Sequence, residues 1–447
     1  MSTVAPRPEP GTSDTPIGSA LELLALGTGL VLVMGLLARL PPWSAELGRF
    51  QALYLVAFAF YALAVVRAGR FRFAPSAPAI VLAVAAAARL ALLPVTPSLS
   101  DDLYRYVWEG RVAALGFDPY RFAPLAPELA PLRDAVIFPR VNHPELSSIY
   151  PPFSMAGFAL VAALSPTVIA MKLWNVLHDL ALVGALLAWM RRKGLGPEVV
   201  IAYAWCPLVL VEYAGNGHND PTAMLWLVLA LMWVDRRPTA SALAFAAGAL
   251  TKLAPLAALP FLIARWPWRA RLLAAGATGA GLLAYWRLTR VPSSGLDAYW
   301  HTWRNNDLVF HYLAAAVGSE TAARWLAAGI VCGVALVAFA RGASPGDGTR
   351  STLRAALLTG PVAHPWYFGW ALALEPLGPS GGWLLLSLTC VLSYGFLVPP
   401  AEGGSFHAPL SWRWIEYGAP LALGVALALW ARRRRGSGRE AARLTGR

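Results

Sequence analysis

The sequence is dominated by runs of about 17–25 mostly apolar residues, which recur from Leu21 to Trp430. As an α-helix, each run is long enough to cross the ~30 Å hydrocarbon core of a bilayer. Only 14% of the residues are charged, whereas soluble domains carry roughly 25%. The pattern excludes a soluble globular fold and predicts an all-α, polytopic transmembrane bundle.

The basic residues indicate which loops stay in the cytoplasm. Arginines follow the second apolar run (Arg67, Arg70 and Arg72), and the run Arg432–Arg435 follows the last one. Because cytoplasmic loops are enriched in Lys and Arg, we expect both chain ends inside. The net charge of +13 is then explained without a nucleic-acid partner. We expect a disordered cytoplasmic tail over 1–18, one membrane domain over 19–431 and a basic cytoplasmic tail over 432–447.

The apolar runs define the expected spans. Two runs carry polar residues near their middle, and we expect breaks at Thr251–Pro255 and at His364–Tyr367 that line a polar cavity. We place the stretch 152–165 along the outer interface, because the cluster Arg191–Lys193 then stays inside. The chain should make about 12–14 crossings, with an outer segment over 98–167 that holds juxtamembrane helices. The spans are expected at about 20–40, 50–67, 76–96, 168–190, 197–213, 221–234, 239–264, 271–288, 321–340, 351–376, 382–398 and 414–431.

The outer segment begins with a polar helix. Ser100 can cap it, and Asp101 and Asp102 then lie in the first turn, where the helix dipole favours carboxylates. One face carries residues spaced at i, i+3, i+4 and i+7, and Gly110 offers a stop or kink. A carboxylate and a guanidinium on one face suit a reaction that removes a proton while holding a phosphate; the alternative is a solvated helix with a salt bridge. The face consists of Asp102, Arg105, Tyr106 and Glu109.

Further polar motifs converge on the same side of the predicted bundle. This convergence describes a membrane enzyme or receptor with an aromatic-rich site at the outer leaflet. The motifs are Tyr150-Pro-Pro152, His218-Asn-Asp220, His301 to Asp307 and His364-Pro-Trp-Tyr367.

Several of these residues have competing interpretations. Asp220, followed by Pro, suits a helix cap, a substrate contact or, with His218, a thin metal site. Lys252 in an apolar run either snorkels or faces a cavity and an anionic phosphate. For Arg89 we leave snorkelling and a phosphate contact open, and His178 and Asp179 favour structure over catalysis. The tryptophans and tyrosines near 300 and 366 suit an interfacial belt or stacking against a sugar or isoprenoid.

The ordered set of motifs resembles the GT-C superfamily of integral-membrane glycosyltransferases. It is similar to the bacterial polyprenol-phosphate-mannose-dependent mannosyltransferases and their uncharacterised relatives. The matching pieces are Leu99-Ser-Asp-Asp-Leu-Tyr-Arg-Tyr106, Trp108-Glu-Gly-Arg111, Asp118-Pro-Tyr120, Ile149-Tyr-Pro-Pro152, Tyr203-Ala-Trp-Cys-Pro-Leu208 with Glu212, Gly217-His-Asn-Asp220, Thr251-Lys252 with Pro255, His364-Pro-Trp-Tyr367 and Ile415-Glu-Tyr417.

The resemblance implies a GT-C-like fold and an inverting transfer of a sugar, for which we expect mannose, from a polyprenyl monophosphate to a lipid or glycan acceptor. Asp102 is then the expected base, Asp101 a second acid and Arg105 a phosphate contact. Relatives often carry a Lys where this chain has Tyr150, so another cation must serve the donor. Its candidates are Lys252, Arg89 and Arg304. The remaining expected substrate-binding residues are Tyr106, Glu109, Tyr150, His218, Asp220, His364 and Tyr367.

The resemblance also implies the setting and the partners. We expect a bacterial inner membrane enzyme whose site faces the periplasm or exterior, with a polyprenyl-phosphate sugar, an acceptor and membrane lipids as partners. No cofactor is assigned, and a divalent cation stays open because some relatives bind one through paired acids. The rivals are a flippase for a lipid-linked intermediate, a GT-C enzyme using another lipid-phosphate sugar, and an inactive lipid-binding relative. The flippase is disfavoured because the chain shows no internal repeat.

Overall fold

The computed structural model of the chain describes residues 16–70, 76–397 and 409–444, and in these ranges the regular structure is helical apart from one isolated bridge between Asn305 and Val362. The predicted all-α class is confirmed. The α-helices are α1 Pro16–Leu37, α2 Leu47–Arg70, α3 Ala77–Leu92, α4 Asp102–Ala114, α5 Pro152–Leu164, α6 Val168–Arg192, α7 Ile201–Ala204, α8 Pro207–Val209, α9 Asp220–Trp233, α10 Pro238–Ala249, α11 Leu259–Ile263, α12 Trp268–Leu288, α13 Gly295–Thr302, α14 Leu308–Val317, α15 Glu320–Ala340, α16 Pro345–Thr359, α17 Phe368–Leu372, α18 Gly381–Thr389, α19 Tyr394–Leu397 and α20 Leu410–Leu444. Short turns of 3-10 helix are η1 Pro127–Leu132, η2 Phe138–Arg140, η3 Pro197–Val200, η5 Ala254–Ala258, η6 Pro365–Tyr367, η7 Glu375–Leu377 and η8 Cys390–Ser393, and η4 Leu210–Gly215 is a π-helix.

Four of the described helices are long and apolar enough to cross a membrane alone. They are Gly18–Leu37, Leu47–Ala68, Val168–Arg192 and Glu320–Ala340, and a bent pair at 197–215 brings the total to five if it is one span. Six shorter apolar helices of 10–17 residues accompany them. The chain is a multi-pass membrane protein; the 12–14 crossings stay a prediction.

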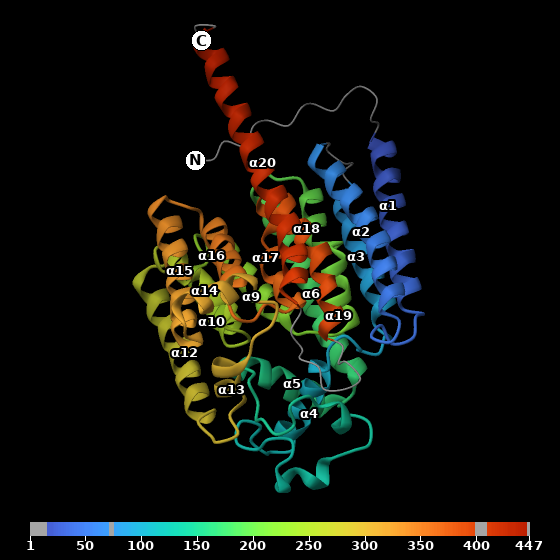
Figure 1. Cartoon of the computed structure of the whole chain (residues 1–447), viewed down its shortest axis with the longest axis vertical. Coiled ribbons are helices and arrows are strands. Elements are labelled where there is room, and N and C mark those ends of the chain that lie inside the picture. Colours follow the sequence, from blue (N-terminus) through green and yellow to red (C-terminus); the bar gives the residue numbers. More distant parts are fainter. Residues whose placement is uncertain (1–15, 71–75, 398–408, 445–447) are drawn as a thin grey trace.

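The two ends of the molecule differ (Figure 1). The start of α1 and the end of α20 lie at one end, and α4 and α5 lie at the opposite end. This arrangement agrees with the expected placement of both chain ends on one side. The backbone of α20 continues as helix to Leu444, past the expected start of the basic tail at 432. Residues 1–15 of the expected N-terminal tail and 445–447 lie outside the described ranges.

Both predicted breaks are present. The helix α10 ends at Ala249 and the chain resumes as η5 at Ala254, and α16 ends at Thr359 before η6 begins at Pro365. A third break was not expected: the run 197–213 is bent by 52° between Ala204 and Pro207. Proline explains it, since it has no backbone N–H to continue the helical bonding.

The helices α4 and α5 pack against each other at one end of the bundle (Figure 1). Contrary to the stop or kink predicted at Gly110, α4 runs through it to Ala114. A Cβ at Gly110 would clash with the carbonyl oxygen of Phe158, so the glycine permits the close crossing of α4 over α5. The 13 residues of α5 are too few to span a bilayer by themselves.

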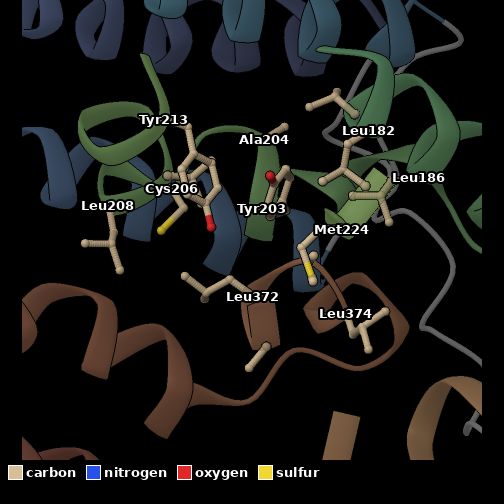
Figure 2. Packing of buried hydrophobic residues seen from close by; sticks show 14 of the residues in the cluster. Leu182, Leu186, Tyr203, Ala204, Cys206, Leu208, Tyr213, Met224, Leu372 and Leu374 are labelled. Carbon is tan, nitrogen blue, oxygen red and sulfur yellow. The ribbon is translucent and has the colours of Figure 1, made fainter. Parts of the chain in front are cut away.

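The bent pair lies at the centre of the core. Figure 2 shows Tyr203, Cys206 and Tyr213 from this region packed with Leu182 and Leu186 of α6. Met224 of α9, Leu372 of α17 and the neighbouring Leu374 complete the cluster, and each of these side chains is fully buried. This packing brings the break at 204–207 beside the break at 360–367, so the irregular segments meet inside the bundle.

Candidate active site

A cavity of about 480 Å³ opens beside the breaks at Thr251–Pro255 and His364–Tyr367, and its lining is mostly apolar. It extends from Tyr299 to Ala335, which lies fifteen residues into α15 and therefore ~22 Å along that helix. On α15, one of the helices able to span a membrane, the lining residues are Val331, Cys332 and Ala335. Its apolar wall includes Leu253, Leu256, Ala257, Pro260, Leu296, Val331, Leu353 and Ala356.

Lys252 supplies the positive charge of this cavity. Of the described residues that line it, Lys252 is the only one with a cationic side chain. Its Nζ lies 2.8 Å from both carboxylate oxygens of Asp220, and 5.3 Å from the ring centroid of Tyr367. Trp370 Nε1 donates to Asp220 at 2.6 Å. Lys252 therefore faces a cavity with a partner, and the snorkelling interpretation is wrong.

Asp220 lies in the first turn of α9, directly after the N-cap Asn219. The cap makes no side-chain hydrogen bond, and the carboxylate of Asp220 binds Lys252 and Trp370 instead. The interpretation of Asp220 as a helix cap is wrong. Because a carboxylate at a helix N-terminus is stabilised by the dipole, Asp220 is a fixed anion that orients the ammonium of Lys252.

Asp102 is the first residue of α4, and its side chain is 23% exposed. Asn142 Nδ2 donates to its Oδ1 at 2.8 Å, and His218 Nδ1 lies 3.7 Å from its Oδ2. Burial raises the pKa of Asp102 above its usual value, while the hydrogen bond from Asn142 and the charge of Lys252 oppose that rise. Asp102 is thus a partly accessible carboxylate with increased basicity near the Lys252 ammonium.

Asp101, the adjacent acid, points elsewhere. Its carboxylate pairs with Arg140 at 2.6 Å, and 43% of its side chain is exposed. The Arg140 guanidinium also stacks on Tyr104 and donates to the carbonyl of Pro97. Helix α4 begins one residue later than Ser100 capping would predict, and Asp101 is its N-cap residue. Asp101 therefore anchors the entry to α4 in this structure.

Arg105 and Glu109 form the ion pair expected on the face of α4. The distance between Arg105 Nε and Glu109 Oε1 is 2.6 Å, both side chains are buried, and Ser148 donates to the second oxygen of Glu109. The guanidinium also donates to the carbonyls of Asn142, His143 and Leu146. The helix is buried rather than solvated, and Arg105 holds the segment that delivers Asn142 to Asp102. A phosphate contact by Arg105 stays an untested prediction.

Two histidines flank Trp366. The ring of His218 stacks on it with a centroid distance of 3.9 Å, and the ring of His364 does so at 4.4 Å. The Nε2 of His218 lies 3.3 Å from Glu212 Oε2. Burial lowers the pKa of His218 well below its usual value, and the charge of Lys252 adds to this effect. His218 is therefore a neutral imidazole between Asp102 and Glu212.

Aromatic side chains connect the polar cluster with the cavity. Tyr150 and Tyr367 line the cavity, and the hydroxyl of Tyr367 lies 3.4 Å from that of Tyr299. Tyr106 is buried, stacks on Phe158 and lies edge-on to Tyr150. Tyr106 is thus a support behind Tyr150 rather than part of the cavity wall.

The other candidate cations lie outside the cavity. Arg89 is fully buried and binds Asp179 at 2.7 Å. Arg304 pairs with Asp307 and Glu320. Neither residue lines the cavity. Within the described ranges, no group of three or more His, Cys, Asp or Glu side chains is arranged to hold a metal ion.

Sequence reasoning missed two side chains of the site. Asn142 lies in an irregular stretch without any motif, and only the fold brings it 40 residues back to Asp102. Trp370 belongs to the aromatic group for which an interfacial belt and stacking against a sugar or isoprenoid were both left open; it stacks on Tyr367 and binds Asp220, a contact that was not predicted. Its spacing of three residues from Tyr367 in a helical turn was a usable signal.

Comparison with known families gives one match. The model of glycosyltransferase family 87 matches residues 149–376, just over half of the chain. The matched region includes the cavity wall from Ile149 onward, the histidines His218 and His364, and the Lys252–Asp220 pair. No curated protein and no solved structure matches significantly.

Proposed function

The chain belongs to glycosyltransferase family 87, and from that premise we propose that it transfers mannose from a polyprenyl monophosphate to a lipid or glycan acceptor, with inversion. The reaction takes place at the outer face of a bacterial inner membrane. The single observation that carries the proposal is a mostly apolar cavity of about 480 Å³ in which Lys252 is the one cationic lining residue among those described.

The donor fits this cavity in one direction. Its isoprenoid chain occupies the apolar wall along α15, and its phosphate lies against the ammonium of Lys252. Asp220 and Trp370 hold that ammonium from behind. In this arrangement the sugar lies between the phosphate at Lys252 and the carboxylate of Asp102, two residues whose charges interact. The ring of Tyr367 lines the cavity beside this position and suits contact with a sugar face.

The chemistry is a single displacement. The carboxylate of Asp102 takes the proton of the acceptor hydroxyl, the acceptor oxygen bonds to the anomeric carbon, and the bond from that carbon to the phosphate oxygen breaks. The polyprenyl phosphate leaves with the bonding electrons, and Lys252 stabilises its growing charge. Since the phosphate leaves as a stable anion, the reaction needs no acid on the leaving group.

The test is the transfer of radiolabelled mannose from polyprenyl-phosphate-mannose by wild type and Asp102→Asn in native membranes. We expect Asp102→Asn to reduce kcat by ~10³-fold, since a general base contributes typically 10²–10⁴-fold, with an unchanged thermal midpoint. Equal transfer by both proteins would contradict the assignment of the base.

A second measurement separates the donor from the reaction type. Wild type is supplied with other polyprenyl-phosphate sugars, and movement of a fluorescent lipid-linked sugar across the bilayer is followed in parallel. Transfer of another sugar but not of mannose would show that the donor carries that other sugar. Lipid movement without any transfer, equal in wild type and Asp102→Asn, would favour the flippase.

A further inference from the structure

One imidazole lies between two carboxylates that come from different parts of the chain. The Nδ1 of His218 faces Oδ2 of Asp102 at 3.7 Å, and its Nε2 faces Oε2 of Glu212 at 3.3 Å. His218 is 1% exposed, and neither ring nitrogen has a hydrogen bond of good geometry. A buried polar ring in this state costs free energy, so its position calls for an explanation other than packing.

Backbone and aromatic contacts fix the ring in this place. Gly217, the preceding residue, has φ of +79°, a conformation that favours glycine. A Cβ there would lie 2.9 Å from Leu103 and 3.0 Å from Lys172. The hydroxyl of Tyr213 donates to the carbonyl of Trp366 at 3.1 Å. This hydrogen bond holds Trp366, on which the His218 ring stacks. Several contacts therefore fix the orientation of the His218 imidazole.

The surroundings of the ring decide its protonation. The titratable and charged groups that face His218 are Asp102 from α4, Glu212 from η4, and Lys252 and His364 from the two broken segments. Burial and the positive charge of Lys252 keep the imidazole neutral, so it has one N–H and one lone pair. For the proposal below, we assign the N–H to Nε2, the nitrogen with the shorter contact, 3.3 Å to Glu212. Nδ1 then presents its lone pair to Asp102.

We propose that His218 is a positioning residue for the base: its Nδ1 accepts a hydrogen bond from Asp102 once Asp102 carries the acceptor's proton. The inference rests on the proposed function, because it presupposes Asp102 as the base. During transfer the proton moves from the acceptor oxygen to Oδ2 of Asp102, while the bond to the anomeric carbon forms and the phosphate leaves. The new O–H of Asp102 then turns to Nδ1. Asn142 keeps Oδ1 in place throughout.

The proposed hydrogen bond shifts the pKa of Asp102 in a direction that the pH profile can measure. A lone pair that binds only the protonated form of Asp102 raises the pKa of that carboxyl, in addition to the effect of burial. Removal of the lone pair lowers that pKa, so the acidic limb of the pH profile of kcat/KM moves to lower pH. The opposite tautomer would bind the ionised carboxylate, and its removal would move the limb to higher pH.

The experiment compares His218→Phe with wild type, because phenylalanine preserves the stacking on Trp366 and removes both nitrogens. We expect kcat to fall about 10–100-fold, as for a lost hydrogen bond in the transition state. The KM values for donor and acceptor should stay within ~2-fold, and the acidic limb should move to lower pH. The matched control is His178→Phe, which changes a second histidine whose ring contacts a tryptophan, Trp174, in a tilted arrangement and outside the cavity lining. It should leave kcat and the limb unchanged.

A second variant keeps the inference testable if His218→Phe does not fold. His218→Ala opens space at the ring position, and added imidazole should restore part of kcat, whereas added toluene of similar size should not. An unchanged kcat and limb in His218→Phe, a limb moved to higher pH, or equal rescue by toluene would each overturn the inference. Asp102→Asn is assayed in parallel. If Asp102→Asn is inactive while the His218 variants are unaffected, Asp102 remains the base and only the role of His218 is wrong. If Asp102→Asn is fully active, the proposed function fails as well.

Discussion

Two of the buried ion pairs, Arg89–Asp179 and Lys252–Asp220, have nearly the same length and differ in what surrounds the cation. Arg89 binds Asp179 at 2.7 Å, both side chains are fully buried, and the guanidinium also donates to the carbonyls of Ala85 and Ala204. Tyr203 donates to the same carboxylate at 2.6 Å. Protein groups thus enclose this pair from several directions.

The second pair, Lys252 and Asp220, has a contact of 2.8 Å, but 13% of the lysine side chain is exposed and borders the cavity. Its carboxylate is as buried as that of Asp179. Burial and pairing alone therefore do not mark a functional charge in this bundle. The distinguishing property is open space beside the cation, where a ligand's phosphate can approach.

The largest effect should come from breaking the enclosed pair. Arg89→Met leaves Asp179 as an uncompensated buried charge, which typically costs 3–5 kcal/mol of stability. Thermal unfolding in detergent should show this loss, while transfer activity per folded molecule stays within ~2-fold of wild type.

The double variant Arg89→Met with Asp179→Leu is the control, because it removes both charges and should recover most of the stability. Normal stability together with lost transfer in Arg89→Met would instead make Arg89 part of the donor site.

The open pair should respond in the reverse way. Lys252→Met removes the cation that we propose meets the leaving phosphate, and transfer should fall ~10²-fold, the magnitude of one lost charge-stabilising group. Stability should change less than in Arg89→Met, because Trp370 still donates to Asp220 and the cavity admits water. Steady-state transfer assays and thermal unfolding of the same preparations measure both quantities.

Lys252→Arg keeps the charge and should retain more activity than Lys252→Met. If Lys252→Met unfolded as readily as Arg89→Met and kept wild-type activity per folded molecule, the contrast between the two pairs would be wrong.

The smallest effect is expected at Asp101. Its pair with Arg140 is a partly exposed one, and such pairs contribute about 0.2–1 kcal/mol. Asp101→Asn should therefore change the thermal midpoint slightly and transfer by less than ~3-fold. A loss of transfer as large as that of Asp102→Asn would show that both acids act in catalysis, as a second-acid role predicts.

Much of the fold follows from periodic patterns and could be predicted. The apolar runs give membrane helices, and Lys252 with Pro255 and His364 with Pro365 give the two breaks, because a polar residue and a proline together disfavour a continuous helix in lipid. The break before Pro207 was missed because no charged residue accompanies that proline.

The candidate site could be predicted only as a set of residues. Asp102, His218, Asp220 and Lys252 were identified and lie together in the structure. The sequence could not rank Lys252, Arg89 and Arg304 as phosphate ligands, because each is a cation near an apolar run. Their partners distinguish them: Lys252 binds a carboxylate 32 residues away along the chain, Arg89 one that is 90 residues away, and Arg304 one that is 3 residues away.

The amino-acid sequence by itself determined the membrane bundle, the breaks at 251–255 and 364–367 and the acidic start of α4, because these depend on local composition and spacing. Only the tertiary structure decided which charges face open space and which are enclosed. Asp101 and Asp102 are adjacent residues of the same type, yet their partners differ. Asp101 pairs with Arg140, whereas Asn142 and His218 lie beside Asp102. The physical reason is that a side chain's accessibility and partners depend on which distant segments pack around it, and local sequence does not specify that packing.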